Sequence, residues 1–438
     1  MAEAKEKQKS KIETIEMKTI EQDIITPLLK WYDQNKRILP WRGSRDPYKI
    51  WVSEIMLQQT RVEAVKPYYE RFMAELPDVH KLASAKEERL LKLWEGLGYY
   101  NRVRNMQKAA IRIEEQYQGE FPKTYDEIIQ LSGIGSYTAG AIASIAFHEP
   151  VPAVDGNVLR IISRLILYEE DILSQKAKNE VRDMLLPFMD VQGRSGDINQ
   201  ALMELGATIC VPNGAPHCED CPWEKMCQAH QKKVWQEYPK KAAKKSRRIE
   251  KKTVLIVGDG EHILLHKRPA KGLLAAMYEL PNYEGELSEK EAVSAVRALG
   301  MAPLRIQKTR KAKHIFSHIE WEMSGYRFLV EPVEYWKDNT EDDNNSRNGQ
   351  YENGRNENNS RNGRNENNPN GQQQNSQNEN DGPDGQNQNI GNENDRWSED
   401  YFWVTKEKTE KDYAIPSAFS AFTEYFDMKP GIGKKIHK

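Results

Sequence analysis

All four cysteines of this 438-residue chain lie in one short stretch, CVPNGAPHCEDCPWEKMC, residues 210–227. Gaps of seven, two and five residues separate Cys210, Cys218, Cys221 and Cys227. Four thiolates so close in sequence can converge on one centre, which favours either zinc or a four-iron cluster. Zinc sites usually contain two close pairs of ligands, whereas only Cys218 and Cys221 are close here. The stretch therefore predicts a loop that folds around a metal centre.

Other parts of the sequence indicate an intracellular protein. It contains no run of about 18 apolar residues, so we expect no membrane span and no membrane partner. The first residues, MAEAKEKQKSK, are charged and lack the apolar core of a secretion signal. We expect a cytoplasmic location, where reduced, clustered cysteines favour metal binding over disulfides.

Apolar periodicity divides the chain into an all-α part and an α+β part. Stripes at helical spacing, separated by Gly and Pro, recur in segments such as 50–62 and 156–167. Later, TVLIVGDGEHILLHKRP has two apolar runs around Gly258-Asp259-Gly260, which is typical of a β-hairpin. The predicted segments are a charged extension at 1–18, a helical domain at 19–237, a basic linker at 238–252, and an α+β domain at 253–435 interrupted by an insertion at 338–395.

The insertion differs in composition from the rest of the chain. Residues 338–395 are rich in Asn, and Tyr351 and Ile390 are their only large apolar side chains. Such sequence cannot bury enough apolar surface to offset the entropy of ordering, so we expect a disordered surface loop. A partner-binding or aggregation role stays open. These residues carry a charge of −8, which leaves +6 on the remainder and is compatible with a nucleic-acid partner.

The stretch LSGIGSYTAGAIASIAF, residues 131–147, predicts two helices joined by a tight turn at Gly133-Ile134-Gly135. Glycines allow the turn and let a phosphate approach the backbone, while the amides at the start of the second helix point outward. Such a helix-hairpin-helix can hold a DNA phosphate without reading sequence. By itself the pattern is equally compatible with a simple helical corner.

Two carboxylates form the candidate catalytic pair. Glu54 lies in the middle of an apolar helical segment, where burial raises the pKa of a carboxyl and keeps it protonated. Asp155 follows an apolar run and precedes Gly156-Asn157 at a predicted helix start, where it could also be a simple N-cap. An acid paired with an anion is the combination that cleaves a glycosidic bond through an oxocarbenium-like state.

Several motifs together resemble the MutY-type adenine DNA glycosylases. They are SEIMLQQTRV around Glu54, GLGYYNRVRN at 96–105, GIGSYTAGAIASIAF, VDGNV at 154–158, NQALMELGA at 199–207 and the cysteine loop. The resemblance implies a helix-hairpin-helix glycosylase domain with an iron-sulfur loop, followed by a Nudix-like C-terminal domain. It also implies base excision repair of adenine opposite 8-oxoguanine or guanine in double-stranded DNA, by a monomer associated with the nucleoid if bacterial.

The resemblance assigns roles to individual residues. Glu54 would protonate adenine, Asp155 would stabilise the sugar cation, and Tyr137 and Asn157 would position Asp155 and the substrate. The flipped adenine would occupy a pocket, and other residues would contact DNA or 8-oxoguanine; for the aromatic residues among them core packing is the alternative. The pocket residues are Trp41, Arg42, Leu57 and Gln200, and the DNA contacts are Gln59, Thr60, Leu97, Tyr99, Gly133 and Gly135.

Tyr137 separates this sequence from a related class. Endonuclease III-like glycosylases carry a lysine at this hairpin position, which attacks the sugar as an amine nucleophile. A phenol forms no Schiff base, so we expect a monofunctional glycosylase. A non-catalytic damage-binding protein of the same fold and an enzyme acting on thymine or oxidised pyrimidines are the alternatives.

For the cysteine loop the resemblance implies a [4Fe-4S] cluster. The family has six residues in the first gap, and this chain has seven, which we expect to form a bulge at VPNGAPH. The cluster would fold a basic loop, including Lys225, against the DNA backbone and would take no direct part in hydrolysis.

The C-terminal motifs resemble the recognition module of the same family. They are RPAKGLLAAMYELPN at 268–282 and FSH at 316–318. Arg297 and Ala298 stand where a Nudix hydrolase needs two adjacent glutamates for magnesium, so pyrophosphatase activity is not expected. Ser317 would contact 8-oxoguanine, flanked by Phe316 and His318; an ordinary strand-edge serine is the alternative.

Overall fold

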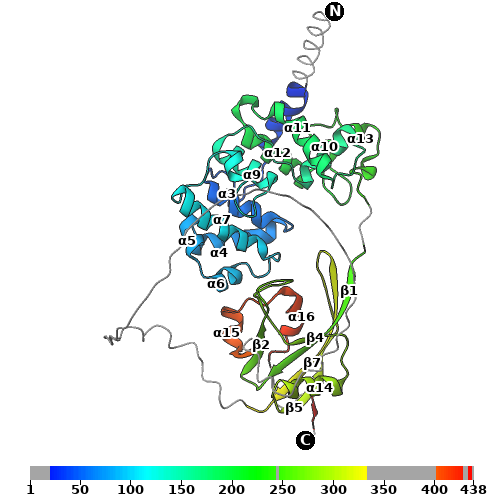
Figure 1. The fold of residues 1–438 in the computed structure, drawn as a ribbon. Coiled ribbons are helices and arrows are strands. Elements are labelled where there is room, and N and C mark those ends of the chain that lie inside the picture. Colours follow the sequence, from blue (N-terminus) through cyan, green and yellow to red (C-terminus); the bar gives the residue numbers. More distant parts are fainter. Residues whose placement is uncertain (1–19, 243–245, 333–400, 428–432, 437–438) are drawn as a thin grey trace, which may run out of the picture.

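The computed structural model describes residues 20–242, 246–332, 401–427 and 433–436. The expected extension at 1–18 and insertion at 338–395 lie outside them. The N-terminal part is helical and the C-terminal part is built on a mixed sheet (Figure 1), which confirms the predicted fold class. Within the described residues, no helix has both the length and the apolar character needed to cross a membrane.

The helical domain begins with a π-helical turn at Glu21–Ile25 and ends after a short 3-10 turn at Trp235–Glu237. Its α-helices are α2 (Thr26–Asn35), α3 (Pro47–Leu57), α4 (Val62–Glu75), α5 (Val79–Ser84), α6 (Glu87–Leu93), α7 (Asn101–Tyr117), α8 (Tyr125–Ile128), α9 (Ser136–Phe147), α10 (Gly156–Ile166), α11 (Gln175–Leu185), α12 (Ser195–Thr208) and α13 (Gln228–Gln231).

Two hydrophobic cores divide this domain into lobes. The first is formed mainly by α3 to α9, and Trp51, Trp94 and Phe72 are among its fully buried side chains. The second joins α2 to α10, α11 and α12, and its partly buried rim includes three of the four cysteines. Helices α9 and α12 pack across the boundary. Helix α3, which carries Glu54, therefore belongs to the first lobe. Helix α10, which begins directly after Asp155, belongs to the second lobe.

Helix α3 is shorter than the predicted segment 50–62. It begins at Pro47 behind the N-cap Asp46, whose carboxylate accepts from the Tyr48 amide at 2.9 Å, and it ends at Leu57. The chain turns there because Gln59 adopts a left-handed conformation with φ 63°. The apolar periodicity continues into α4, so the sequence pattern did not predict the turn between α3 and α4.

The C-terminal domain contains one nine-stranded sheet. Its main path runs β3-β2-β1-β7-β5-β9, and β4, β6 and β8 pair with β1, β7 and β2 respectively. The predicted hairpin is confirmed, since β1 and β2 pair antiparallel across residues 259–262. The strands are β1 (Arg248–Gly258), β2 (His262–Lys267), β3 (Tyr278–Glu279), β4 (Asn282–Glu284), β5 (Pro303–Lys308), β6 (Ala312–Ile315), β7 (Ile319–Val330), β8 (Tyr401–Thr405) and β9 (Lys434–Lys435).

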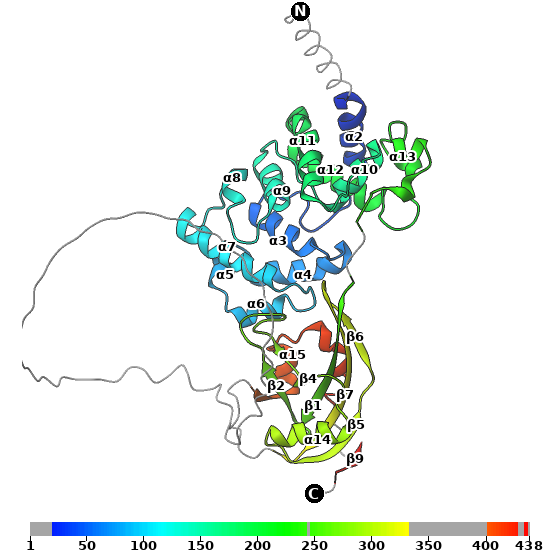
Figure 2. The ribbon, with the colours of Figure 1, turned by 45° about the vertical axis from the view of Figure 1, so that its right-hand side comes forward.

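Helices cover both faces of this sheet. One face packs against Phe419, Phe422 and Phe426 in and beside α16 (Ser420–Thr423), next to α15 (Lys406–Lys411). The other face packs against α14 (Glu289–Ala298) through Ala292 and Val296. Figure 2 shows α14 and α15 on separate sides of the strands. This arrangement leaves the β6–β7 hairpin projecting toward the helical domain.

The linker boundaries at 238–252 need correction. Tyr238 is 6% exposed and its carbonyl accepts from Arg164 Nε at 3.0 Å, so the chain is still packed on the helical domain there. Strand β1 already begins at Arg248, and residues 248–252 pair in parallel with Ile319–Met323. The charged composition suggested a solvated tether. However, a strand satisfies its backbone through the neighbouring strand while alternate charged side chains remain in water.

The two domains touch through apolar and polar contacts. Met277 and Ala414 of the C-terminal domain are members of the first helical core. Lys92 Nζ donates to the Tyr413 carbonyl at 3.1 Å, and the Ile415 amide donates to Glu95 Oε1 at 2.8 Å. The loop after α6 is thereby fixed against the second domain.

Candidate active site

Glu54 is buried on α3 and has one hydrogen-bond donor. Its residue exposure is 7%, and the Tyr137 hydroxyl from α9 donates to Oε2 at 2.5 Å. Burial raises the pKa of Glu54 to about 7; the Tyr137 hydrogen bond opposes this shift and the nearby Asp155 charge adds to it. The predicted raised pKa is therefore confirmed in direction. Near neutral pH, this carboxyl can hold a proton and release it.

Asp155 is the N-cap of α10, as its sequence context allowed. Oδ1 accepts from the amides of Asn157 at 2.8 Å and Val158 at 2.7 Å, and Oδ2 accepts from Asn157 Nδ2 at 2.8 Å. Burial raises the pKa of Asp155, although all three donors favour the anion and oppose the shift. Desolvation by burial thus acts against the anion, and the three donors act for it.

Tyr137 and Asn157 have separate partners. Asn157 contacts Asp155, as predicted, but Tyr137 contacts Glu54 rather than Asp155 and also lies 3.6 Å from Met203 Sδ. Burial raises the pKa of Tyr137 well above its ordinary value, and the charges of both Glu54 and Asp155 add to this shift. The phenol therefore remains a hydrogen-bond donor between two carboxyls that come from different lobes.

Arg160 extends the site to the cysteine loop, and sequence reasoning missed it. Its Nη2 donates to Asn157 Oδ1 at 2.8 Å and to the Gly206 carbonyl at 2.7 Å, and its Nε donates to the Cys210 carbonyl at 2.9 Å. A continuous chain of contacts thus joins Asp155 to Cys210. The available signal was spacing, because Arg160 lies three residues after Asn157 on one helix face.

A pocket of about 550 Å³ includes two of the four predicted pocket residues, Arg42 and Gln200, in its lining, but Glu54 and Asp155 are not among its lining residues. Trp41 instead packs edge-on against Tyr69, with ring centroids 5.2 Å apart, and Leu57 packs on the first core. Neither side chain is part of this pocket's lining, since both point toward apolar neighbours.

Glu204 holds Arg42 in place, and no sequence pattern predicted a role for Glu204. It is 1% exposed and pairs with Arg37 Nε at 2.6 Å and Arg42 Nη2 at 2.8 Å. Burial favours the neutral acid, but the two arginines outweigh that effect and hold the pKa of Glu204 below its usual range. Glu204 thus remains an anion that fixes the arginine of the pocket.

The predicted turn at Gly133-Ile134-Gly135 is present. Gly133 has φ 76°, and a Cβ there would lie 2.6 Å from the Asn105 Cβ on α7. Gly135 is the N-cap of α9 and is exposed, with open space around it. The first amides of α9 are thereby left accessible, as phosphate binding would require.

Gln59 and Tyr99 project from two adjacent turns. Both are exposed and left-handed, with φ 63° and 49°, which is unusual for residues with side chains. Thr60 is half-buried beside Gln59. Leu97, which we expected to contact DNA, is 6% exposed and belongs to the first core. Its side chain is therefore turned inward, because the loop buries its apolar residue and exposes its aromatic one.

The FSH loop lies at the turn between β6 and β7. Ser317 and His318 are exposed, whereas Phe316 packs edge-on against Trp321 at 4.8 Å. The Ser317 hydroxyl lies 3.0 Å from the Tyr99 hydroxyl of the helical domain. Phe316 thus has the packing role that was the alternative, while Ser317 faces the other domain.

All four cysteines line one small pocket together with Arg164 and Trp235, and none forms a disulfide. Arg164 Nη1 lies 3.2 Å from Cys210 Sγ. Four thiols gathered at one pocket are a donor set that can hold a metal centre, such as zinc or a four-iron cluster.

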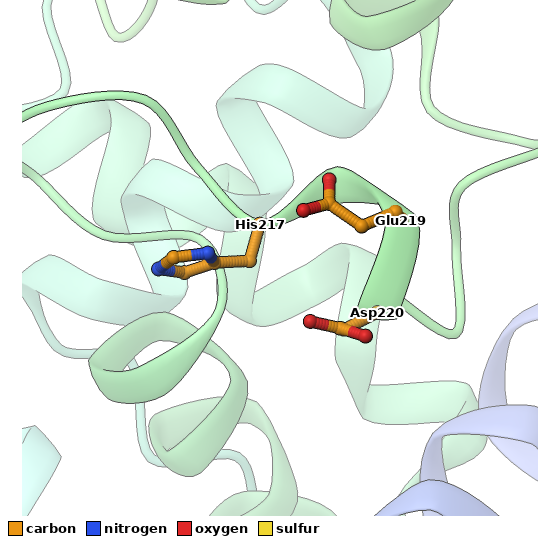
Figure 3. Close-up of side chains that lie close together, drawn as sticks. All are labelled: His217, Glu219 and Asp220. Carbon is orange, nitrogen blue, oxygen red and sulfur yellow. The ribbon is translucent and has the colours of Figure 1, made fainter.

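The segment between Cys210 and Cys218 forms a loop whose two ends lie close together. The His217 amide donates to the Ile209 carbonyl at 3.0 Å, so the seven residues between Cys210 and Cys218 form an outward loop. His217, Glu219 and Asp220 approach one another on its exposed face (Figure 3). These side chains flank Cys218 in sequence and point to solvent.

The comparisons with known proteins agree with this geometry. Residues 52–187 match the HhH-GPD superfamily base excision DNA repair protein family, and residues 253–352 match the NUDIX domain family. The adenine DNA glycosylase of Mus musculus is 36% identical over 362 residues, which cover 69% of this chain and 70% of the mouse protein. The chain belongs to the adenine DNA glycosylase family. It is a DNA N-glycosylase of base excision repair.

Other members and solved structures extend the comparison. The adenine DNA glycosylase of Buchnera aphidicola subsp. Baizongia pistaciae is 32% identical, over 71% of this chain and 88% of that protein. A thermostable thymine-DNA glycosylase matches 50% of this adenine glycosylase chain and 99% of its own, with 26% identity and a TM-score of 0.43. A trapped endonuclease III–DNA covalent intermediate covers 49% of this chain and 98% of its own, with 23% identity and a TM-score of 0.41.

Proposed function

We propose that this glycosylase excises adenine mispaired with 8-oxoguanine or guanine in duplex DNA. The observation that carries the proposal is the buried carboxyl of Glu54, whose pKa of about 7 suits a general acid. The negative charge of Asp155 contributes to that raised pKa. An acid of this kind is required because adenine leaves poorly as an anion. Family membership supports adenine as the base that leaves.

The chemistry divides between the two carboxyls. Glu54 gives its proton to the flipped adenine, the bond between the sugar carbon and the base nitrogen breaks, and the bonding electrons leave with the base. Asp155 acts as the anion that stabilises the positive charge developing on the sugar, and its three donors stabilise that anion. Water then adds to the sugar carbon and yields an abasic site. Glu54, now ionised, accepts the proton of that water.

Tyr137 supports hydrolysis without strand cleavage. Its phenol donates to Glu54 and has no amine to attack the sugar. The product is therefore an intact abasic strand. This property distinguishes the proposed monofunctional enzyme from one that proceeds through a Schiff base.

Recognition of the opposite base is assigned to both domains. Gln59 and Tyr99 enter the stack beside it, and the hydroxyl of Ser317 contacts 8-oxoguanine. The proximity of Tyr99 and Ser317, 3.0 Å between hydroxyls, supports a shared contact region. The amides at the start of α9 hold a backbone phosphate of the DNA. One enzyme molecule contains all of these elements, so we propose a monomer.

The cysteine residues would hold a [4Fe-4S] cluster. Cys210, Cys218, Cys221 and Cys227 would supply the four thiolates, since all four line one small pocket and none forms a disulfide. When bound, the cluster crosslinks the loop and presents its exposed Lys225 toward the DNA backbone. The chemistry at the sugar proceeds through Glu54 and Asp155.

Single-turnover excision assays test the proposed function. Duplexes with adenine opposite 8-oxoguanine, adenine opposite guanine, adenine opposite thymine, and a thymine mismatch are incubated with excess enzyme, and abasic sites are cleaved with alkali. We expect fastest release from the 8-oxoguanine duplex and no cleavage before alkali. Tight binding with intact adenine would instead indicate a damage-binding protein, and thymine release would overturn the assignment.

A further inference from the structure

Arg102, the second residue of α7, joins the two turns that carry Gln59 and Tyr99. Its Nη1 donates to the carbonyls of Ile55 at 2.6 Å and Gln58 at 2.7 Å. Its Nη2 donates to the carbonyls of Leu97 and Gly98, both at 3.1 Å. One guanidinium group therefore holds four carbonyls from two separate segments.

The first pair of carbonyls belongs to the end of α3. Carbonyls in the last turn of a helix lack partners within the helix, and a cation there is favourable. Ile55 follows Glu54 directly, and Gln58 is the C-cap of α3. Arg102 consequently fixes the turn of α3 that positions the buried carboxyl of Glu54.

The second pair belongs to the turn that exposes Tyr99. The Arg102 guanidinium lies 5.7 Å from the centre of the Tyr99 ring and 5.3 Å from that of Trp94. Both turns are unusual, because Gln59 in the first turn and Tyr99 in the second have positive φ. Such backbone conformations persist only where neighbouring groups hold them.

The environment of Arg102 is unfavourable for a cation. Arg102 is half-buried, its buried Nε has no hydrogen-bond partner, and no carboxylate among the described residues pairs with it. Desolvation of a cation held only by carbonyls and aromatic rings is unfavourable, and the hydrogen bonds to the four carbonyls offset that cost. The position of Arg102 therefore depends on both segments, and the position of each segment depends on Arg102.

We propose that Arg102 is a positioning residue that couples recognition of the base opposite adenine to the placement of Glu54. This inference rests on the proposed function. When Gln59 and Tyr99 enter the DNA stack, their turns shift together because one rigid guanidinium holds both. The same group holds the last turn of α3. Correct insertion beside 8-oxoguanine therefore leaves Glu54 in reach of the flipped adenine, and incorrect insertion displaces it.

Arginine is required because its planar fork reaches both segments at once. A lysine ammonium keeps the charge but is a compact donor on a flexible stem, and it cannot span four carbonyls in two directions. R102K therefore retains charge and approximate volume while losing the link. R102M removes the charge as well. R112M is the matched control, since Arg112 is on the same helix and bonds the Gln130 carbonyl, away from both turns.

The experiment compares single-turnover excision of adenine opposite 8-oxoguanine and opposite guanine for the wild type, R102K, R102M and R112M. Thermal unfolding is recorded for each protein. We expect R102K to slow excision opposite 8-oxoguanine by roughly 100-fold, as misplacement of a catalytic group by about 1 Å does. Excision opposite guanine should fall much less, so the ratio of the two rates drops by about tenfold or more.

A general loss of stability would lower both rates in proportion and leave their ratio unchanged. An unchanged ratio in R102K overturns the inference, whatever happens to R102M, because R102K alone tests the link. Normal discrimination in R112M is expected, and its loss would show that any change in α7 has the same effect. A wild-type enzyme that treats the two opposite bases equally would defeat the proposed function instead.

Discussion

The hydroxyl of Tyr99 lies 3.0 Å from the hydroxyl of Ser317, although the two residues are 218 positions apart and belong to different domains. Neither hydroxyl has another side-chain partner within hydrogen-bond distance among the described residues. In the protein without DNA, the hydroxyls of Tyr99 and Ser317, both of which we expect to lie against the opposite strand, therefore form a hydrogen bond with each other. Under the proposed function, binding of 8-oxoguanine would replace this contact by contacts to the base.

Ser317→Ala should reduce the preference for 8-oxoguanine over guanine by about tenfold, the worth of one well-placed hydrogen bond. The measurement is the ratio of single-turnover rates on the two duplexes. Tyr99→Phe is the matched control, because it breaks the same bond in the free protein but retains the ring that stacks on DNA. A ratio that changes equally in both variants would mean that the domain contact, and not the base contact, matters.

Excision should decrease as pH rises through about 7, because Glu54 acts as an acid only while it is protonated and its pKa is about 7. The hydrogen bond from Tyr137 favours the Glu54 anion and lowers that pKa. Tyr137→Phe should therefore move the midpoint of the alkaline limb to higher pH. Single-turnover rates from pH 5 to 9, an interval of about two units on each side of that pKa, give the midpoint for the wild type and for Tyr137→Phe. The same midpoint in both proteins would contradict the assignment of Glu54 as the acid.

Glu54→Gln should abolish excision, retain mismatch binding and alter the pH dependence of stability. A carboxyl with a raised folded pKa stabilises the fold fully below its unfolded pKa of 4.5, and that contribution is lost as pH rises through about 7. The loss is on the order of 3 kcal/mol. Urea unfolding measures the free energy of unfolding at pH 5 and at pH 8. The decrease in that free energy between the two pH values should be smaller in Glu54→Gln than in the wild type. Equal declines would indicate that Glu54 ionises freely.

Gly206→Ala should slow excision about 100-fold through displacement of Asn157. A Cβ at Gly206 would lie 2.6 Å from the Asn157 Cβ, and Asn157 holds Asp155. The measurement is the single-turnover rate alongside mismatch affinity. Ala207→Ser changes an exposed residue of the same helix and should leave the rate near that of the wild type. A normal rate in Gly206→Ala would argue against positioning of Asp155 by Asn157.

Anaerobically purified protein should contain iron and absorb visible light, and Cys221→Ser should lose both. The second helical core should then lose stability, because Cys221 packs against it. Iron and zinc contents are measured together with the unfolding midpoint. Stoichiometric zinc without iron would contradict the proposed cluster and indicate a zinc site instead.

Local patterns were sufficient to predict much of the fold and the burial of Glu54. A glutamate within an apolar stripe predicts a buried acid, and α3 does bury Glu54 with a raised pKa. The glycine pair at 133 and 135 predicts a turn, and the runs around 258–260 predict a hairpin. Each of these inferences depends on neighbours within a few residues, and such neighbours are adjacent in the sequence as well.

Local sequence patterns were enough to predict which residue types lie at the site, but the partners of those residues follow from the packing of distant elements. Tyr137 contacts Glu54, Arg102 joins two turns, and the charged segment at 248–252 continues β1, because helices and strands distant in sequence pack there. A side chain chooses among donors according to which elements pack beside it. That choice depends on how two helical lobes and a sheet fit together, and no local pattern encodes it.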